Sequence, residues 1–469
     1  MRISLLNPPY SLDDYFGSLS RTGSIQQPLG IAYVSSFLKV SSHKVQLIDG
    51  SALRCTVHDL VREVSRFHPD IVGITATTPG YRKALELAKQ VKGELGLPII
   101  LGGPHVTSLA PDTLGESVFD YGVIGEGEIT TLNLLDTLER GGELSRVEGI
   151  AFKKDGEVKV TPRREYIKDL DLLPFPDRDS LPPLSAYRPS PSSYRRLPLG
   201  TMVTSRGCPH HCIFCDRAVF GNLYRARGAS NVVDEMEALV TRHGAKEVRF
   251  WDDTFNLYPK RVIQICEEII RRKLDVEWTC VARVSNMTSD ILKTMRRAGC
   301  WQVDYGIETG NAAILAGIQK GITIDLVRRA VAKSRSNGLH VRGFFMLGLP
   351  GETSGTMRET IEFAKTLALD VAVFHITTPL PGTELYTAAK QRGEISHNAG
   401  WENYLMFSAD NPPYVTSGLT KGLLQEYHRR AYREFYLRPR FLIEQMARVR
   451  TPEDIIRYGK ALTTVASFD

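Results

Sequence analysis

The sequence predicts an α/β protein in which two sheet-bearing domains are followed by a helical region. Short apolar runs alternate with helical patterns over residues 1–150, the same alternation resumes over residues 200–390, and residues 391–469 are mostly helical in pattern. Such alternation is typical of parallel sheets covered by helices, and 469 residues exceed what one core holds. We therefore expect a doubly wound, Rossmann-like domain at 1–150, a linker at 151–199, a second α/β domain at 200–390 and a helical domain at 391–469.

The first domain contains five candidate strands and four segments of helical length. The strands are Ile3–Leu6, Val45–Ile48, Ile71–Thr75, Ile99–Leu101 and Tyr121–Ile124, and the helical segments are Leu29–Leu38, Val57–Phe67, Tyr81–Leu95 and Val106–Leu114. A doubly wound sheet binds its ligand at the carboxyl ends of the strands, so the residues that follow each strand are the candidates for binding.

The second domain repeats this rhythm with six candidate strands, which favours a parallel sheet. The strands are Gly200–Ser205, Glu247–Trp251, Glu277–Ala282, Gln302–Ile307, Val341–Leu347 and Val371–Thr377, and the helices are Val232–His243, Pro259–Lys273, Ser289–Ala298, Ile324–Asn337 and Thr356–Ala368. Chemistry in α/β barrels is found at the C-terminal ends of the strands.

The linker and the tail have distinct compositions. Ala151–Thr161 reads as a small hairpin around Asp155-Gly156, and the Pro-, Ser- and Arg-rich stretch that follows is typical of an extended connector. The tail helix Leu423–Leu437 is basic and amphipathic. Such a helix packs on its parent domain or lies on a membrane surface, and we favour the first.

Composition limits the classes of function. A hydrophobic content of 42% and a charged content of 24% are those of a soluble globular protein. No apolar run approaches the length of a membrane span, and the N-terminus reads as a strand rather than a signal peptide, so we expect a cytoplasmic protein. The net charge of +6 does not indicate a nucleic-acid partner. Seven cysteines, an odd and sparse number, do not make a disulfide framework.

The most informative motif is a cysteine cluster with the spacing C-x-x-x-C-x-x-C, formed by Cys208, Cys212 and Cys215. One short loop thus carries three thiolates, the ligands that hold iron–sulfur clusters. Three ligands on a four-iron cluster leave one iron open to a substrate or cofactor. A structural zinc completed by His210 or His211 is the alternative, although a zinc ribbon usually shows two separated C-x-x-C pairs.

This motif, with the aromatic Phe214 before its last cysteine, resembles the signature of the radical S-adenosylmethionine (SAM) superfamily. The resemblance implies a partial (β/α)6 TIM-like barrel, a 4Fe-4S cluster held by the three cysteines, and SAM at the strand ends. It places Asp252 or Asp253 near the methionyl amine of SAM and Arg283 near the carboxylate. The remaining SAM-binding residues that it implies are Phe214, Ser285, Glu308 at the ribose, and Gly348 and Gly351 at the adenine.

Other roles are open for three of these residues. Asp252 and Asp253 suit the N-cap of a helix, because a short acid there accepts hydrogen bonds from the first backbone N–H groups. Arg283 suits an ordinary ion pair with a nearby acid.

The strand ends of the first domain resemble those of cobalamin-binding domains, where a hydroxyl-rich loop and a Gly-Gly loop flank the buried nucleotide tail. The implied cobalamin-binding residues follow four of the strands: Asn7, Pro8, Thr75, Thr77, Thr78, Gly102, Gly103, Pro104, His105, Gly125, Glu126 and Gly127. The well-known D-x-H-x-x-G motif, whose histidine ligates cobalt, is absent, because Asn7-Pro8-Pro9-Tyr10 stands in its place. We expect the segment Thr77 to Tyr81 to cover the lower face of the cobalamin.

Together the resemblances imply a cobalamin-dependent radical SAM methyltransferase that methylates an unactivated carbon of a small molecule. A flavodoxin or ferredoxin is the expected electron donor, and the mild positive charge favours an anionic or lipid-like substrate. Three alternatives stay open: a non-methylating enzyme with the same cofactors, which closes or contracts a ring; a cobalamin-binding sensor with a structural metal; and a radical SAM enzyme whose Rossmann-like domain is empty. A methylthiotransferase is disfavoured because the first domain holds only Cys55.

Overall fold

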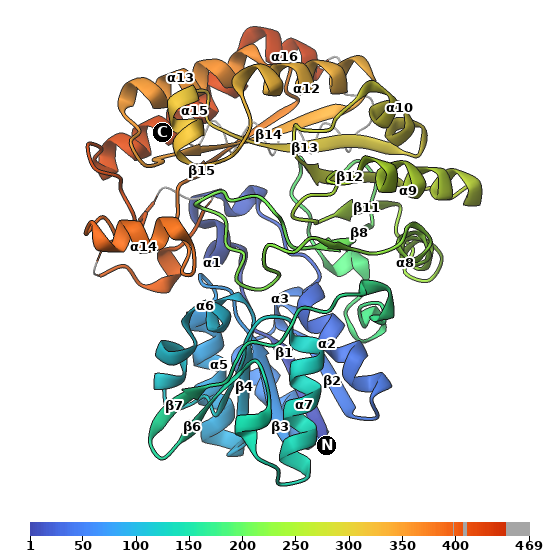
Figure 1. Cartoon of the computed structure of the whole chain (residues 1–469), viewed down its shortest axis with the longest axis vertical. Coiled ribbons are helices and arrows are strands. Elements are labelled where there is room, and N and C mark those ends of the chain that lie inside the picture. The colour runs from blue at the N-terminus through green and yellow to red at the C-terminus, as the bar shows by residue number, and fades with distance from the viewer. Residues whose placement is uncertain (397, 407–409, 447–469) are drawn as a thin grey trace.

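The computed structural model describes residues 1–396, 398–406 and 410–446, and each half of the molecule contains one large sheet (Figure 1). The first sheet has the order β2-β1-β3-β4-β5-β6-β7. Its strands are β1 (Arg2–Asn7), β2 (Lys44–Asp49), β3 (Ile71–Thr75), β4 (Ile99–Gly102), β5 (Tyr121–Val123), β6 (Ile150–Lys154) and β7 (Glu157–Val160). The first five strands are parallel, and β6 and β7 are antiparallel to their neighbours.

Helices cover both faces of this sheet, which confirms the doubly wound architecture. They are α1 (Leu12–Phe16), α2 (Leu29–Val40), α3 (Gly50–Leu53), α4 (Val57–Phe67), α5 (Tyr81–Leu95), α6 (Pro104–Gly115) and α7 (Gly127–Glu139). One core packs α4, α5 and α6 on the sheet, and a second packs α2 and α7 on the opposite face. The strongly amphipathic α4 begins at a capping box between Thr56 and Asp59, which satisfies backbone N–H groups that its first turn leaves free.

The hairpin of β6 and β7 belongs to the first sheet rather than to a linker. Strand β6 pairs with β5 through Tyr121–Phe152 and Val123–Ile150. The domain boundary expected at residue 150 therefore falls inside a strand, and the sheet continues to Val160. The pattern of a hairpin alone does not reveal the strand with which it pairs.

The second sheet has six parallel strands in the order β15-β14-β13-β12-β11-β8, as predicted. They are β8 (Leu199–Met202), β11 (Glu247–Phe250), β12 (Glu277–Ala282), β13 (Cys300–Glu308), β14 (His340–Leu347) and β15 (Val371–Ile376). The strand expected at Gly200–Ser205 is divided, because Ser205 belongs to β9 (Ser205–Arg206), which pairs antiparallel with β10 (Arg225–Ala226).

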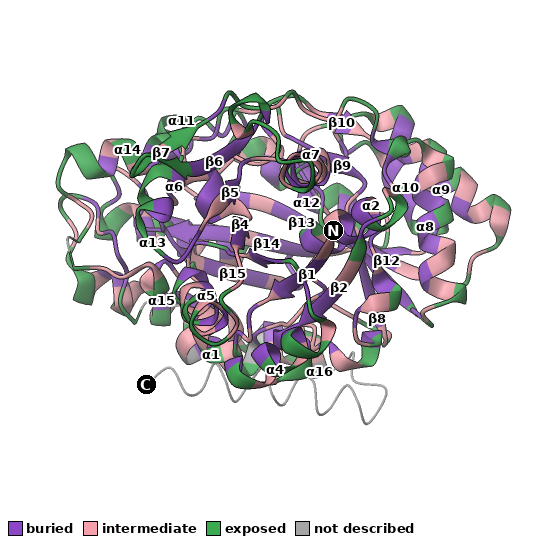
Figure 2. Ribbon diagram, turned by 90° about the horizontal axis from the view of Figure 1, so that it is seen from below, coloured by how far each residue is buried: buried purple, intermediate pink, exposed green. Residues whose placement is uncertain are grey.

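The helices of this domain lie on the outer side of the sheet. They are α8 (Ala229–Thr241), α9 (Pro259–Arg272), α10 (Ser289–Arg297), α11 (Ala312–Gly317), α12 (Ile324–Ser336) and α13 (Ser354–Thr366), whereas α14 (Glu384–Gln391) lies between β15 and the first domain (Figure 1). Figure 2 shows buried strands at the centre and exposed residues on the outward surfaces of the helices. Among the residues that the structure describes, no helix has the length and apolarity needed to cross a bilayer.

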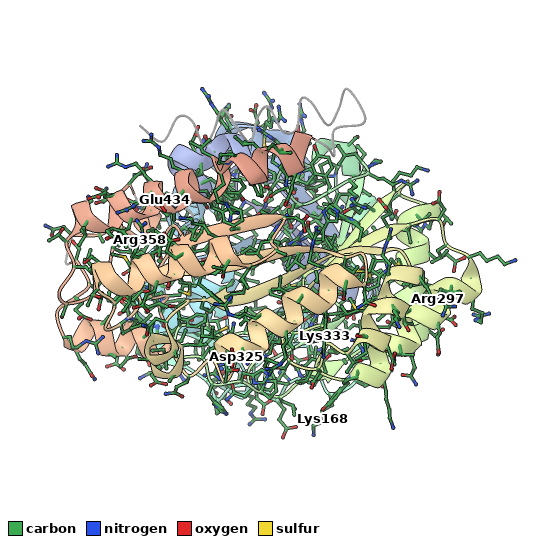
Figure 3. The ribbon with its side chains drawn as sticks, turned by 90° about the horizontal axis from the view of Figure 1, so that it is seen from above. Lys168, Arg297, Asp325, Lys333, Arg358 and Glu434 are labelled. Carbon is green, nitrogen blue, oxygen red and sulfur yellow. The ribbon has the colours of Figure 1, made fainter. Side chains whose placement is uncertain are left out.

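The tail packs on the second domain, as favoured from its pattern. Helix α15 (Lys421–Tyr436) lies along the edge strand β15, where the hydroxyls of Tyr432 and Tyr436 bond to the backbone of Phe374 and Ala372. Unpaired edge groups are thereby covered. The charged side chains point outward, and Figure 3 shows Arg358 on α13 beside Glu434 on α15, with 3.1 Å between Nη1 and Oε1. Helix α16 spans Pro439–Met446, and the tail prediction for 447–469 lies outside the described residues.

Candidate active site

The carboxyl ends of the two sheets face each other across the centre of the molecule (Figure 1). Glu126 follows β5 of the first sheet, and its Oε1 lies 2.8 Å from Nη1 of Arg206 in β9, immediately before the cysteine loop. Ser108 on α6 lies beside Gly382, which follows β15. The predicted sites of both domains therefore share one region.

The cysteine loop begins at a position that only glycine fills. Gly207 has φ +83°, and a Cβ there would lie 2.3 Å from the carbonyl oxygen of Leu223. From this turn the loop places Cys208 half-buried, Cys212 buried and Cys215 exposed. The backbone N–H of Ile213 donates to the carbonyl of Ile318, so the loop is fixed against the second domain.

The chemistry of the three thiols fits a cluster that brings positive charge. Burial raises the pKa of Cys215 to about 12 although solvent reaches one side of it, and the Asp253 carboxylate and the other two thiols add to the shift. Within the described residues no three His, Cys, Asp or Glu side chains converge to hold a single ion. Ligands of a four-iron cube bind separate irons, so Cys208, Cys212 and Cys215 need not converge in that way.

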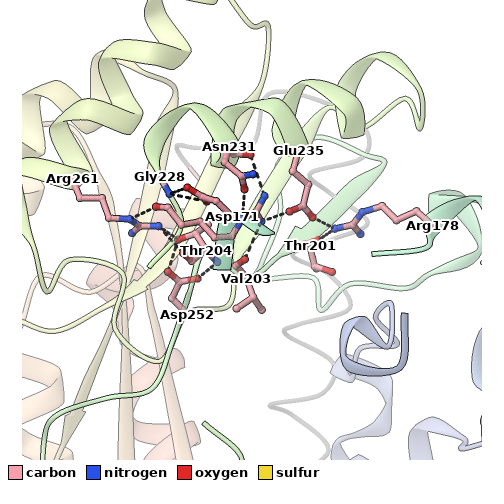
Figure 4. Close-up of polar contacts among 11 residues, drawn as sticks. Asp171, Arg178, Thr201, Val203, Thr204, Gly228, Asn231, Glu235, Asp252 and Arg261 are labelled. Atoms are coloured by element: carbon pink, nitrogen blue, oxygen red, sulfur yellow. Dashed lines mark hydrogen bonds and ion pairs between the residues drawn. The ribbon is translucent and has the colours of Figure 1, made fainter. Parts of the chain in front are cut away.

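Of the two predicted aspartates, only Asp253 is open to a ligand. Both oxygens of Asp252 are taken, at 2.6 Å by the backbone N–H of Thr204 and at 2.5 and 2.6 Å by the hydroxyls of Thr204 and Ser205. Figure 4 shows Asp252 and Arg261 both reaching Thr204. Neither aspartate caps a helix, since α9 begins only at Pro259.

Asp253 is accessible and accepts one hydrogen bond, from the backbone N–H of Gly207 at 3.2 Å. Burial of the carboxyl and, next in size, the charge of the neighbouring Asp252 together raise its pKa to about 6. A cationic amine beside Asp253 would lower this pKa again, because it stabilises the charged carboxylate.

Hydrogen bonds fix the backbone of Arg283 and one end of its guanidinium group, while one N–H donor of the side chain has no partner among the described residues. Asn256 accepts from its backbone N–H at 2.9 Å and donates to its carbonyl and to that of Ser285, while Nη2 of Arg283 donates to the carbonyl of Lys320. Among the described residues the buried Nε of Arg283 has no partner. Within the part of the chain that the structure describes, this side chain forms no ion pair with an acid, and the orphaned donor suits an anionic ligand.

Glu308 occupies a strained backbone position at the end of β13. Its φ is +69°, and the register between β13 and β14 shifts at this point. Strain of this kind in a residue other than glycine is concentrated at functional sites. The buried Glu308 carboxylate forms an ion pair with Lys320, at 2.5 Å between Oε1 and Nζ.

Sequence reasoning missed Lys320. Burial opposes its charge, but Glu308 and then the Cys212 thiol raise its pKa. Its Nζ lies 5.7 Å from the ring centroid of Phe214, so the lysine connects the cysteine loop, the Glu308 carboxylate and Arg283. A lysine before a glycine in a loop gives no sign of burial, because lysine is usually exposed.

The turn after β14 is built around a buried acid. Gly348 and Gly351 both have positive φ, and the backbone N–H groups of Gly348 and Leu349 donate to Glu352 at 2.6 and 2.9 Å. Burial raises the pKa of Glu352 to about 8. The carboxyl group shapes the turn that we expected at the adenine.

In the first domain, Gly102 and Gly103 provide open backbone where β4 ends. A Cβ on Gly102 would meet only one atom within 4 Å, the carbonyl oxygen of Ile74 at 4.0 Å. Gly103 has φ +100°, and a Cβ there would lie 2.7 Å from the carbonyl of Ala76, which excludes other residues. Pro104 follows as the first residue of α6. A bulky ligand can therefore approach this backbone closely.

Hydroxyl and aromatic groups surround this opening. Thr77 Oγ1 lies 2.8 Å from the Tyr15 hydroxyl, and Thr78 Oγ1 lies 3.3 Å from Nδ1 of the buried His105. The His105 ring stacks on Tyr81 at 4.1 Å between centroids, and its burial lowers its pKa to about 4.

The buried hydroxyl of Ser108, near the opening, has no partner among the described residues, and the buried hydroxyl of Tyr10 interacts with Tyr15. An orphaned polar atom beside open backbone fits a large ligand that carries amide groups, as cobalamin does. Thr75 ends β3 beside Gly103.

Three predicted cobalamin residues have structural partners instead. Asn7 Nδ2 donates to Asp49 at 2.8 Å, and the Pro8 carbonyl accepts from the hydroxyl of Ser51. Among the residues expected at the cobalamin, Glu126 differs most clearly from the prediction, because protein donors occupy its carboxylate. Its carboxylate accepts from Arg206, from Arg225 at 2.8 and 2.9 Å, and from the backbone N–H of Ile167.

Glu126 therefore joins the two domains. Glu128 takes part as well, since its Oε1 accepts from Nη2 of Arg206 at 2.6 Å. All four of these side chains are buried. We call Glu126, Glu128, Arg206 and Arg225 the interdomain ion cluster. The two acids lie on the segment that begins at Gly125. Gly125 precedes α7, and Gly127 is the first residue of that helix.

Comparison with known proteins agrees with this division. The family model of the radical SAM superfamily matches residues 202–364, and that of the B12 binding domain matches residues 19–135. An uncharacterized methyltransferase of Pyrococcus horikoshii is 37% identical over 95% of both chains. An anaerobic magnesium-protoporphyrin IX monomethyl ester cyclase of Rubrivivax gelatinosus is 30% identical over 94% of this chain and 78% of its own length.

Among solved structures, the radical SAM methyltransferase TsrM of Kitasatospora setae, with cobalamin and a [4Fe-4S] cluster bound, has the same fold. The two structures superpose with a TM-score of 0.76 over 99% of both chains, at 17% sequence identity. The chain therefore belongs to the radical SAM superfamily, in the branch that carries a B12 binding domain and whose cofactors are a 4Fe-4S cluster, SAM and cobalamin.

Proposed function

We propose that this protein is a cobalamin-dependent radical SAM methyltransferase that methylates an unactivated carbon of a small molecule. The observation that carries the proposal is the meeting of the cysteine loop with the carboxyl edge of the first sheet, joined by the Glu126–Arg206 ion pair. When bound, the reduced cluster supplies the electron that cleaves SAM and cobalamin supplies the methyl group. The protein itself has to position both cofactors and exclude water.

The residues around the cysteine loop offer a partner for each polar part of SAM. Asp253 would hold the ammonium, and the orphaned Nε of Arg283 would donate to the carboxylate. Glu308, oriented by Lys320, would accept from the ribose hydroxyls. The turn from Gly348 to Gly351 would border the adenine.

The first domain would hold cobalamin against the open backbone of Gly102 and Gly103. The hydroxyls of Thr75, Thr77 and Thr78 would serve its polar groups, and the aromatic pair His105 and Tyr81 would pack below. Because no histidine directly follows β1, the segment Thr77 to Tyr81 would cover the lower face of the cobalamin, and an electronic spectrum of the histidine-on form would contradict this arrangement.

The experiment is an anaerobic reconstitution with iron, sulfide and cobalamin, followed by SAM and a strong reductant. Mass spectrometry quantifies two products, 5′-deoxyadenosine and S-adenosylhomocysteine. Cys212→Ala should abolish formation of 5′-deoxyadenosine and leave cobalamin binding intact, whereas Cys55→Ala, in the first domain, should change neither. SAM cleavage that persists in Cys212→Ala would overturn the assignment.

A second candidate is a non-methylating enzyme with the same cofactors, favoured by the similarity to the Rubrivivax cyclase over 94% of this chain. The same experiment separates the two. Formation of both products supports methyl transfer, and 5′-deoxyadenosine alone supports the cyclase-like outcome.

We also infer that the protein works in the reducing cytoplasm with a flavodoxin or ferredoxin as electron donor. All seven cysteines are free in the structure, which suits a reducing compartment. Reconstitution with either donor in place of the chemical reductant tests this inference.

A further inference from the structure

The concave face of the second sheet holds a buried pair of arginines that the SAM site does not use. Arg249 on β11 and Arg342 on β14 both form ion pairs with Asp304 on β13, the second at 3.4 Å. Strand β12 separates β11 from β13, so the contact between Arg249 and Asp304 crosses the concave face. The neighbours Val303 and Tyr305 point the other way, toward the helices, as alternation in a strand requires.

These arginines have more donors than partners. Arg249 is 1% exposed and Arg342 is 4% exposed, yet Nε and Nη1 of Arg249 and Nε of Arg342 bond to nothing among the described residues. Buried N–H groups are nearly always satisfied, and leaving one unpaired is unfavourable. Two positive charges also share the single carboxylate of Asp304, so among the described residues one charge has no counter-ion of its own.

Glu247, a buried acid whose charge acts on Arg342, is already occupied by other donors. The Glu247 carboxylate accepts from the backbone N–H groups of Arg195 and Arg196 and from the indole of Trp301. On the side away from the SAM site, Nη2 of Arg342 donates to the carbonyl of Ser192 in the linker. The unpaired donors of Arg249 and Arg342 therefore suit one further anion.

Partly exposed apolar side chains accompany the arginines on strands β14 and β15 and after β11. Phe344 pairs with Val373 in register, on the same face as Arg342, and both are only half-buried. By contrast Phe345 and Phe374, on the helix-covered face, are fully buried. Trp251 is 37% exposed and its ring centroid lies 4.3 Å from the Arg249 guanidinium carbon. Trp251, Phe344 and Val373 are therefore partly accessible to a ligand.

We propose that Arg249 and Arg342 bind a carboxylate of the substrate, whose apolar body lies along Trp251, Phe344 and Val373. A carboxylate balances the single excess charge and matches the planar fork of an arginine. Asp304 precedes Glu308 by four residues on β13, which places the arginine pair about 13 Å from the ribose-binding end. The substrate class is therefore an elongated apolar carboxylic acid that reacts at a carbon far from its acid group. This inference rests on the proposed function, since it names the substrate of the same site.

Calorimetry on the reconstituted holoenzyme with SAM bound tests it, with octanoate and octanol as probes of equal length. Octanoate should bind roughly ten-fold or more tightly than octanol. Its carboxylate accepts charge-assisted hydrogen bonds from the arginines, and these stabilise the complex more than the hydrogen bonds of a neutral hydroxyl do. Arg249→Gln and Arg342→Gln should each remove this preference. Arg328→Gln, at an exposed arginine of α12, is the matched control and should retain it.

If octanoate does not bind, or binds all three variants alike, the proposed site is refuted. Should a glutamine variant fail to fold, Arg342→Lys keeps the charge without the fork and should weaken octanoate about ten-fold. Formation of 5′-deoxyadenosine is measured on the same preparations. SAM cleavage without octanoate binding would refute this inference alone, whereas absence of SAM cleavage would refute the proposed function.

Discussion

Replacing Glu126 by Gln tests whether the interdomain ion cluster holds the two domains together. The Glu126 carboxylate accepts from Arg206 at 2.8 Å, from Arg225 at 2.8 and 2.9 Å and from the backbone N–H of Ile167 at 2.9 Å. Glutamine offers one carbonyl oxygen and two N–H groups, so at least one guanidinium loses its counter-charge. Breaking a buried pair from one side is unfavourable by about 3–5 kcal/mol, and we expect about 3 kcal/mol because glutamine keeps one acceptor.

Urea unfolding followed by circular dichroism measures this loss, with a lower midpoint at an unchanged slope. The double variant with Arg225→Gln should lose less than the sum of the single variants, since the two residues act on each other. Glu165→Gln breaks an exposed ion pair with Lys168 and should change the stability by less than about 1 kcal/mol. A loss for Glu126→Gln as small as that of Glu165→Gln, or full additivity with Arg225→Gln, would refute the reasoning.

Three further predictions concern single residues. Lys320→Met leaves the buried Glu308 carboxylate without its cation, and SAM affinity measured by calorimetry should fall about ten-fold or more; an unchanged affinity would show that the pair does not serve SAM. Gly103→Ala should lose cobalamin in spectroscopic titration and destabilise the fold by about 1–3 kcal/mol, because alanine is strained at φ +100°. Gly93→Ala, on the open surface of α5, is the control and should stabilise slightly. Burial raises the pKa of Glu352 to about 8, above its usual 4.5, so the folded state holds a proton that the unfolded state has lost. Stability from this group is complete below about pH 4.5 and falls as pH rises toward 8, by at most roughly 1.4 kcal/mol per pH unit. The free energy of unfolding of Glu352→Gln should depend less on pH between about pH 5 and 8 than that of the unsubstituted protein at the same temperature and salt. Identical pH profiles for the two proteins would contradict the raised pKa of Glu352.

Local pattern was sufficient for most elements of the fold. The helices Val57–Phe67 and Tyr81–Leu95 and the strands Ile71–Thr75 and Glu277–Ala282 begin and end where periodicity placed them. Each has a long amphipathic stretch or a compact apolar run with clear stop signals, so its neighbours in sequence suffice. Helix α7 escaped notice because threonines supply part of its buried face.

The sequence by itself determined the order of the domains, the cysteine motif and the strand ends that bear the polar residues, because these follow from spacing along the chain. The tertiary structure decided which of those residues are free to bind. Asp252 is occupied by Thr204 and Glu126 by Arg206, a partner 80 residues away, while the buried Lys320 had no signal of its own. Hydrogen bonds and ion pairs depend on distance in space, and only the folded chain brings such partners within 3 Å of each other.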